Sequence, residues 1–183
     1  MQTTEPVRPQ AEPKRLDPAT TAVLVLDMST RCDDPAAECS QLLDALGAFL
    51  DKARAASVPV VFSVSLSAKG TPLGEVATAL KRQPSETVLY PDGFDKFTGG
   101  ELQQLLEARG VRNLVVTGSA TNFAVMYTAT AAARNYRYNV VIPLDAVNTR
   151  SAYEHEYALH QLSVLPSAAV KIQFSATPMI DFS

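Results

Sequence analysis

The sequence predicts a single α/β domain with a mainly parallel sheet covered by helices on both faces. Short continuous apolar segments, typical of buried parallel strands, recur along the chain, and amphipathic helical segments separate them. A strand, a helix and another strand in succession imply right-handed crossovers, which place helices on both sides of a sheet. The length of 183 residues suits one domain.

The composition excludes several classes of protein. With 46% hydrophobic and 19% charged residues and a net charge of -3, the chain is neither disordered nor strongly basic. No basic excess points to nucleic acid, and no apolar segment approaches the roughly 18 residues needed to span a bilayer. We therefore expect a cytoplasmic protein without nucleic-acid or membrane partners.

The first residues differ in composition from the rest. Residues 1–18 contain four prolines and mixed charge, which predicts a flexible or surface-hugging N-terminal arm, and residues 19–183 are assigned to the domain. Cys32 and Cys39 are the only cysteines, so a secreted disulfide framework is not expected and a reducing compartment is favoured.

The elements follow in order from the first apolar segment, TAVLVLD, which ends on Asp27. Helical spacing of leucines predicts the first helix, with Ser40 as its N-cap, and Gly110 closes a later one. Strands are predicted at 21–27, 59–65, 85–90, 111–118, 139–147 and 168–172, and helices at 40–57, 76–81 (a weaker pattern), 100–110, 121–135 and 151–165.

Two strand ends are candidate sites, because ligands of open parallel sheets bind at the carboxyl ends of strands. Asp27 closes the first strand, where poor solvation would raise its pKa and suit it to proton transfer; alternatively, it caps the following loop. Residues 116–121 form a strand-to-helix turn, whose amides could hold an anion or oxyanion. The alternative there is structural, with Gly118 making the turn and Thr121 the N-cap.

These segments resemble the isochorismatase-like family, which includes cysteine amidohydrolases such as nicotinamidase and N-carbamoylsarcosine amidase. The similar segments are VLVLDMS at 23–29, FTGGELQQLLEARGVRNLVVTG at 97–118, and VVTGSATNFAVMYTATAAARNYRYNVVIPLDAV at 115–147. The resemblance extends from about Ala22 to Ile172. It implies a three-layer α/β/α, Rossmann-like sandwich with a six-stranded, mainly parallel sheet.

The resemblance also implies a site. The family's amidohydrolases use an Asp, Lys and Cys triad, in which the aspartate takes the proton of the attacking cysteine. The aspartate matches Asp27, the oxyanion donors match the amides of Ala120 and Ala124, and the family's non-proline cis peptide falls between Ser119 and Ala120. The positions expected to bind a ligand are Ser119, Ala120, Thr121, Phe123 and Tyr90.

The sequence departs from the family at two catalytic positions. Ala124 occupies the position of the nucleophilic cysteine, which excludes the covalent route. The lysine position, counted back from Phe97, falls near Pro91 beside Tyr90, so the pattern identifies no equivalent lysine. Lys96 lies closer to Phe97 than the pattern requires and is interpreted as a solvated loop lysine.

Other reactive side chains receive structural interpretations. Cys32 is on the loop that overhangs the family's site, where it could line the pocket, but it is not on a strand-to-helix turn with oxyanion donors. His155 and His160 are expected on a helix far from both strand ends. Some nicotinamidases bind a metal through histidines after the first acid, and DMSTRCDDP and VVFSVS have none, so no metal and no cofactor are predicted.

Three hypotheses remain open. The first is a hydrolase of the isochorismatase type, which protonates a vinyl ether from Asp27; the missing lysine counts against it. The second is a pseudo-enzyme that binds a small ligand or serves as a structural subunit. The third is an amidohydrolase in which Ala124 is an engineered replacement of a natural cysteine. A small-molecule ligand and a homo-oligomer, dimer or tetramer, are expected from the resemblance.

Overall fold

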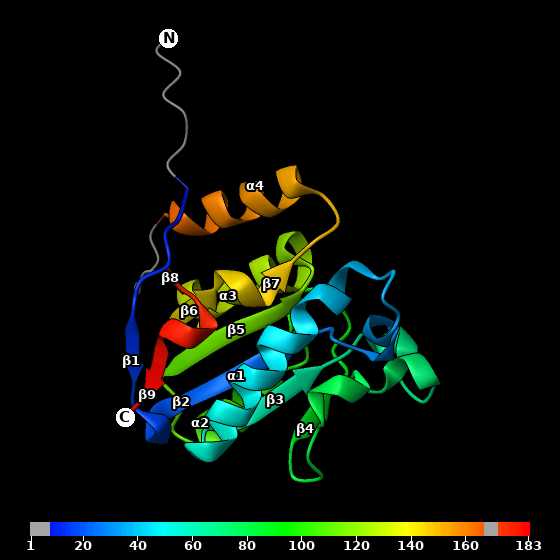
Figure 1. The fold of residues 1–183 in the computed structure, drawn as a ribbon. Coiled ribbons are helices and arrows are strands. Elements are labelled where there is room, and N and C mark those ends of the chain that lie inside the picture. The colour runs from blue at the N-terminus through cyan, green and yellow to red at the C-terminus, as the bar shows by residue number, and fades with distance from the viewer. Residues whose placement is uncertain (1–7, 167–171) are drawn as a thin grey trace.

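One parallel sheet forms the centre of the computed structural model, which describes residues 8–166 and 172–183 (Figure 1). The spatial order is β4-β3-β2-β5-β6-β8, with β7 beside β5. These strands are β2 (Thr21–Leu26), β3 (Val60–Ser63), β4 (Thr87–Leu89), β5 (Asn113–Ser119), β6 (Asn139–Pro143), β7 (Val147–Asn148) and β8 (Ile172–Ser175). The predicted α/β class is confirmed, and the strand beyond the expected six is the two-residue β7.

Helices cover both faces of the sheet, as predicted. They are α1 (Leu43–Ala55), α2 (Glu101–Ala108), α3 (Met126–Arg134) and α4 (Ala152–Ser163). Side chains alternate between the faces of a strand, so Val23 and Val25 of β2 pack in the core with α1, whereas Leu24 and Leu26 pack in the core with α2, α3 and α4. Because both faces are buried, β2 is apolar at almost every position.

The strand order reverses beside β2. The chain passes from β2 to β3 and β4 on one side, then crosses to β5, β6 and β8 on the other (Figure 1). Leu26 is opposite Gly118 in the register between β2 and β5. The carboxyl ends of β2 and β5 therefore meet at the switch point, the position where ligands of such sheets bind.

Several predicted boundaries change in detail. The first helix begins at Leu43, and Ser40 is not its N-cap but lies in a preceding 3-10 turn, where its hydroxyl donates to the carbonyl of Pro35. The weak helical segment at 76–81 forms only a 3-10 turn over Thr78–Leu80. The strand predicted at 139–147 is interrupted by a 3-10 turn at Leu144–Ala146, so that β7 pairs with β5 instead of continuing β6.

The chain ends form a second, small sheet. Lys14–Leu16 of the predicted arm forms β1, which pairs in parallel with β9 (Ile180–Phe182), so this part of the arm lies against the domain. Of the strand predicted at 168–172, residues 168–171 lie outside the described residues, and Ile172 begins β8. Across residues 8–166 and 172–183, none of the helices combines the length and apolar character that a membrane crossing requires.

Gly118 is the position where the packing of β2 against β5 tolerates no side chain. Its φ is +116°, and an added Cβ would lie 2.1 Å from the carbonyl oxygen of Leu26. We expect Gly118→Ala to lower the free energy of unfolding by at least about 3 kcal/mol, measured by urea denaturation. Gly47→Ala is the matched control: in α1, where the nearest atom would be 3.8 Å away, it should be neutral or stabilising. Equal losses in the free energy of unfolding for the two variants would contradict the close approach of β2 and β5 at Gly118.

Candidate active site

Asp27 leaves the end of β2 in a strained but anchored conformation. Its φ of 54° is in the left-handed region, which non-glycine residues adopt mainly where the surrounding structure requires it. Its N–H donates to the carbonyl of Ser63 at the end of β3, over 2.9 Å. The carboxylate is thereby held at the carboxyl edge of the sheet, one residue beyond the buried strand.

Lys96 is the charge partner of Asp27. Its Nζ lies 2.8 Å from Asp27 Oδ2, and its side chain is 2% exposed, against 26% for Asp27. The same ammonium donates to the carbonyl of Gly93 over 3.2 Å. The interpretation of Lys96 as a solvated loop lysine is therefore wrong, and a lysine does reach the aspartate.

The loop before α2 explains how Lys96 turns inward. The Lys96 N–H donates to Thr128 Oγ1 over 3.1 Å, and the Thr128 hydroxyl in turn donates to the carbonyl of Phe94 over 3.2 Å. These two bonds hold the backbone of the loop against α3, so that the lysine side chain extends towards Asp27. Counting back from Phe97 could not reveal this, because the contact depends on how the loop folds, and the position it indicated is the buried Pro91.

The protonation of Asp27 is set by opposing effects. Burial raises the pKa of the Asp27 carboxyl, and the positive charge and hydrogen bond of Lys96 oppose part of that rise, with a smaller lowering effect from the charge of Arg31. Within residues 8–166 and 172–183, Asp27 Oδ1 and the Ser63 hydroxyl are buried without a hydrogen-bond partner. A substrate group that bonds to these atoms would satisfy them.

The strand-to-helix turn after β5 has the predicted form. The peptide between Ser119 and Ala120 is cis, as the resemblance implied. Thr121–Val125 then form a wide turn of π-helical geometry that leads directly into α3. The carbonyl of Ala120 accepts the N–H groups of Phe123 and Val125. The turn thus folds back on Ala120, one residue beyond the end of β5.

Ala124 and the ion pair lie on neighbouring parts of this edge. Ala124 is 1% exposed and precedes Thr128 by one helical turn, so the two share a face of the helix. Thr128 binds the backbone of Lys96, whose side chain reaches Asp27. The last residue pair in the register of β2 with β5 is Leu26 and Gly118, and Asp27 and Ser119 are the next residue on each strand. The acid and the turn thus lie at the same edge of the sheet.

The remaining predicted positions have varied surroundings. The Ser119 hydroxyl donates to the carbonyl of Asn148 in β7 over 3.4 Å. Tyr90 donates its hydroxyl to the carbonyl of Gly74 over 3.1 Å, which ties it to the loop after β3. Phe123 is 44% exposed and stacks on a neighbouring loop residue, Phe94, with ring centroids 4.8 Å apart. Their contact with a ligand remains a prediction.

His155 is a residue that sequence reasoning missed. Its Nδ1 lies 2.9 Å from Thr121 Oγ1, so it contacts the turn and is not far from both strand ends. Helix α4 packs across the turn, which sequence separation concealed. A signal was present, since His155 precedes the buried Ala158 and Leu159 by three and four positions and so shares their face.

Cys32 does not act as a nucleophile in this structure. It forms a disulfide with Cys39, with Cα atoms 5.2 Å apart, and both residues are 0% exposed. They pack in the core on the α1 side of the sheet. The bond closes the loop that follows Asp27, and it leaves neither cysteine with a free thiol.

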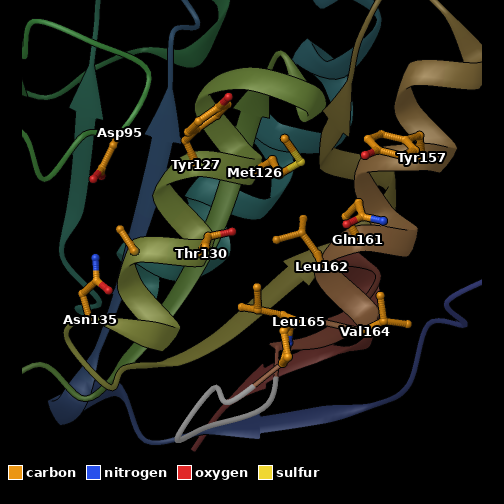
Figure 2. Close-up of a pocket in the computed structure, with 12 residues that line it drawn as sticks. Asp95, Met126, Tyr127, Thr130, Asn135, Tyr157, Gln161, Leu162, Val164 and Leu165 are labelled. Atoms are coloured by element: carbon orange, nitrogen blue, oxygen red, sulfur yellow. The ribbon is translucent and has the colours of Figure 1, made fainter.

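A separate groove lies between α3 and α4 (Figure 2). Its volume is about 420 Å³, and its lining includes Met126 and Tyr127 of α3 and Tyr157 and Leu162 of α4. Neither the ion pair nor Ala124 lines it. Across the described parts of the chain, no three side chains of His, Cys, Asp or Glu are grouped closely enough to hold a metal ion.

The chain belongs to the isochorismatase family: the isochorismatase domain matches residues 21–173. A ureidoacrylate amidohydrolase, RutB of Caulobacter segnis, is 26% identical, over 67% of this chain and 70% of the relative. An isochorismatase family protein of Burkholderia thailandensis has the same fold, with a TM-score of 0.78 and 27% identity over 92% of this chain and 97% of its own. A pyrazinamidase/nicotinamidase of Streptococcus mutans shares the fold, with a TM-score of 0.71 and 20% identity over 83% and 99%.

The unequal burial of the ion pair predicts unequal effects on stability. Asp27→Asn leaves a buried ammonium without its carboxylate, and we expect it to lower the free energy of unfolding at pH 7 by about 3 kcal/mol. Lys96→Met should lower it less, because the more exposed Asp27 carboxyl can take up a proton. Urea denaturation measures both.

The double variant Asp27→Asn with Lys96→Met is the matched control for this comparison. It removes both charges, so it should be more stable than Asp27→Asn alone. A double variant as unstable as the sum of the two single variants would show that the two side chains do not interact.

Proposed function

We propose that this protein is a hydrolase for a small molecule, in which Asp27 transfers the proton and no covalent intermediate forms on a cysteine. The observation that carries the proposal is the buried pair of Asp27 and Lys96 beside the turn that contains Ala124. Loss of the thiol has removed the nucleophile, but the acid and its charge partner are both in place. Membership of a family of hydrolases supports the assignment.

The reaction that suits these groups is the hydrolysis of a vinyl ether. Protonated Asp27 gives its proton to the terminal carbon of the double bond, which leaves an oxocarbenium ion and a carboxylate. Water adds to the cationic carbon and gives one proton to the Asp27 carboxylate, which forms a neutral hemiketal. The hemiketal then collapses to the carbonyl: the ether C–O bond breaks, Asp27 protonates the leaving oxygen, and the hydroxyl proton of the hemiketal returns to Asp27. Burial keeps the proton on Asp27 to higher pH, and Lys96 stabilises the carboxylate once the proton has left.

Lys96 supplies a lysine at the aspartate, although the family resemblance gives the lysine of the isochorismatase type another task, to hold the substrate carboxylates. The isochorismatase type was disfavoured because no lysine matched the family position, and Lys96 reaches Asp27 from a different one. The small Ala124 side chain leaves room for substrate where the amidohydrolases have sulfur. The pair also favours an enzyme over the pseudo-enzyme. Burying an ammonium and a carboxylate costs desolvation free energy, and apolar side chains at these positions would avoid that cost if the pair had no function.

The third hypothesis is that Ala124 is an engineered replacement of a natural cysteine. It requires a natural gene that encodes cysteine at position 124 and an amidohydrolase in the natural protein. The displacement of the lysine is a second departure from the family pattern that one replaced residue does not explain. The sequence of the natural gene at codon 124 decides between the engineered replacement and a natural alanine.

The pH dependence of turnover tests the proposed chemistry. With isochorismate as the probe, pyruvate release should fall as pH rises through the pKa of Asp27, because only the protonated acid can donate. Asp27→Asn should lower kcat/KM at least about a hundredfold. Lys96→Met should move the falling limb to higher pH, because loss of the positive charge raises the pKa of Asp27 further.

Two outcomes count against the proposal. Turnover that survives Asp27→Asn would rule out Asp27 as the acid, and a limb that moves to lower pH in Lys96→Met would rule out the assigned charge effect. Because Asp27→Asn is expected to lose stability, its activity is compared with that of the double variant with Lys96→Met, with the folded fraction of each measured by circular dichroism.

We also propose that copies of the chain associate through the face formed by α3 and α4. Large apolar side chains that are more than a third exposed gather there: Phe94, Phe123, Tyr127, Tyr153, Tyr157 and Val164. Phe94 contacts Phe123 and Tyr127 on one side of the groove, and Tyr153 stacks on Tyr157 on the other. Tyr127 and Tyr157 both line the groove, so the two aromatic groups meet there. Such a concentration of exposed apolar side chains is typical of an interface.

We also propose that the protein is located in the cytoplasm, as the sequence predicted.

Light scattering after size-exclusion chromatography tests the association. Tyr127→Ser combined with Tyr157→Ser should convert an oligomer to a monomer, because both side chains are 50% exposed at the groove. Leu73→Ser is the matched control, since Leu73 is 56% exposed but does not line the groove. A natural chain that is already a monomer would exclude the interface.

A further inference from the structure

The contact between α4 and the turn of the candidate site has no place in the proposed chemistry. Thr121 Oγ1 and His155 Nδ1 are 2.9 Å apart, and Thr121 is 0% exposed. We propose that His155 is a positioning residue, which fixes the turn Thr121–Val125 through the Thr121 hydroxyl. The inference rests on the proposed function only in taking this turn as part of the active site.

The first turn of α4 holds His155 in place. The helix begins after Ser151, whose side chain accepts the N–H of Glu154, and the His155 N–H donates to the carbonyl of Ser151 over 3.0 Å. His155 is therefore set by a capped helix, and it is half-buried against the turn. A rigid element thus presents the imidazole to Thr121.

The turn needs an external partner for Thr121. A threonine hydroxyl at the start of a helix commonly bonds to backbone N–H groups of its own turn. Among the described residues, no backbone N–H donates to Thr121 Oγ1, no side chain caps this turn, and the hydrogen-bond partner of the Thr121 hydroxyl is His155 of α4. By fixing the hydroxyl, His155 keeps it from capping the turn's own amides. Those amides include Ala124, which the family resemblance assigns to the oxyanion.

His155 acts by orientation and not by charge. Burial lowers the pKa of the His155 imidazole, and the opposing effect of Glu156 is smaller. The ring is therefore neutral at neutral pH, where one ring nitrogen carries a proton and the other accepts. Replacement by a neutral side chain that keeps a hydrogen-bonding group at the Nδ1 position should preserve the function.

A thiol introduced at position 124 reports the orientation of the turn directly. In Ala124→Cys, a thiol within the turn, whose amides would stabilise a thiolate, should be alkylated by iodoacetamide with a midpoint below the ordinary cysteine pKa of about 8.5. Cys32 and Cys39 are joined in a disulfide, so alkylation of the native protein reports position 124 alone. The measurement needs no substrate, so it remains valid if the vinyl-ether reaction fails.

The variants are compared in the Ala124→Cys background. His155→Phe and Thr121→Val each remove the bond, and each should shift the midpoint towards the ordinary value and slow alkylation at pH 7 about tenfold. Combining them should give no further change. His155→Asn should retain the low midpoint, because its amide group occupies the position of Nδ1. Tyr153→Phe, at a 79% exposed position on the same helix, is the matched control and should change nothing.

A merely structural His155 would lower thermal stability without moving the pH profile. An unchanged profile in folded His155→Phe and Thr121→Val would therefore overturn the proposal. Because Ala124 is 1% exposed, a thiol at position 124 that iodoacetamide does not reach is titrated through the ultraviolet absorbance of its thiolate, and the same shifts of the midpoint are expected. If His155→Phe does not fold, Thr121→Val carries the test alone, because it removes the same bond with a side chain of the same shape.

Discussion

The close approach of β2 and β5 is the constraint on which the site depends. Gly118 lies so near the backbone of Leu26 that a side chain would not fit between the strands. Since the two strands are parallel and in register, they end at the same edge of the sheet, with Asp27 just after β2 and Ala120 just after β5. One of these is an acid and the other begins a turn into α3. The site is therefore a consequence of strand pairing, and its two halves come from segments far apart in the sequence.

The electrostatics of the site depend on a residue from a third segment. Lys96 follows β4 at the edge of the sheet, and the loop that carries it folds over to α3 through Thr128. A buried carboxyl without this ammonium would be neutral over a wide pH range, and a fully solvated pair would hold no proton near neutral pH. Partial burial of Asp27 beside a nearly fully buried Lys96 gives an intermediate situation, which suits a group that both gives and recovers a proton.

The helix α4 contacts the turn of the candidate site and also lines the groove between α3 and α4. Its first turn contacts Thr121, while its later residues line the groove together with α3. Movement of α4 would thus change the contact between His155 and Thr121. Association of two chains through the exposed aromatic side chains would restrain that movement. The same helix provides a positioning contact and part of a proposed interface, although only the first involves the chemistry of the site.

The sequence by itself determined the α/β class, the order of most elements, the position of Asp27 at the end of a buried strand and the turn at Ser119–Thr121. These follow from local properties: apolar continuity makes a buried strand, helical periodicity makes an amphipathic helix, and a family pattern is read along the chain. Local reasoning failed where a residue acts through space. Lys96, His155 and the bond between Cys32 and Cys39 were misjudged because loop conformation and helix packing decide which side chains meet. Only the tertiary structure shows these contacts, since separation along the chain does not measure distance in the folded protein.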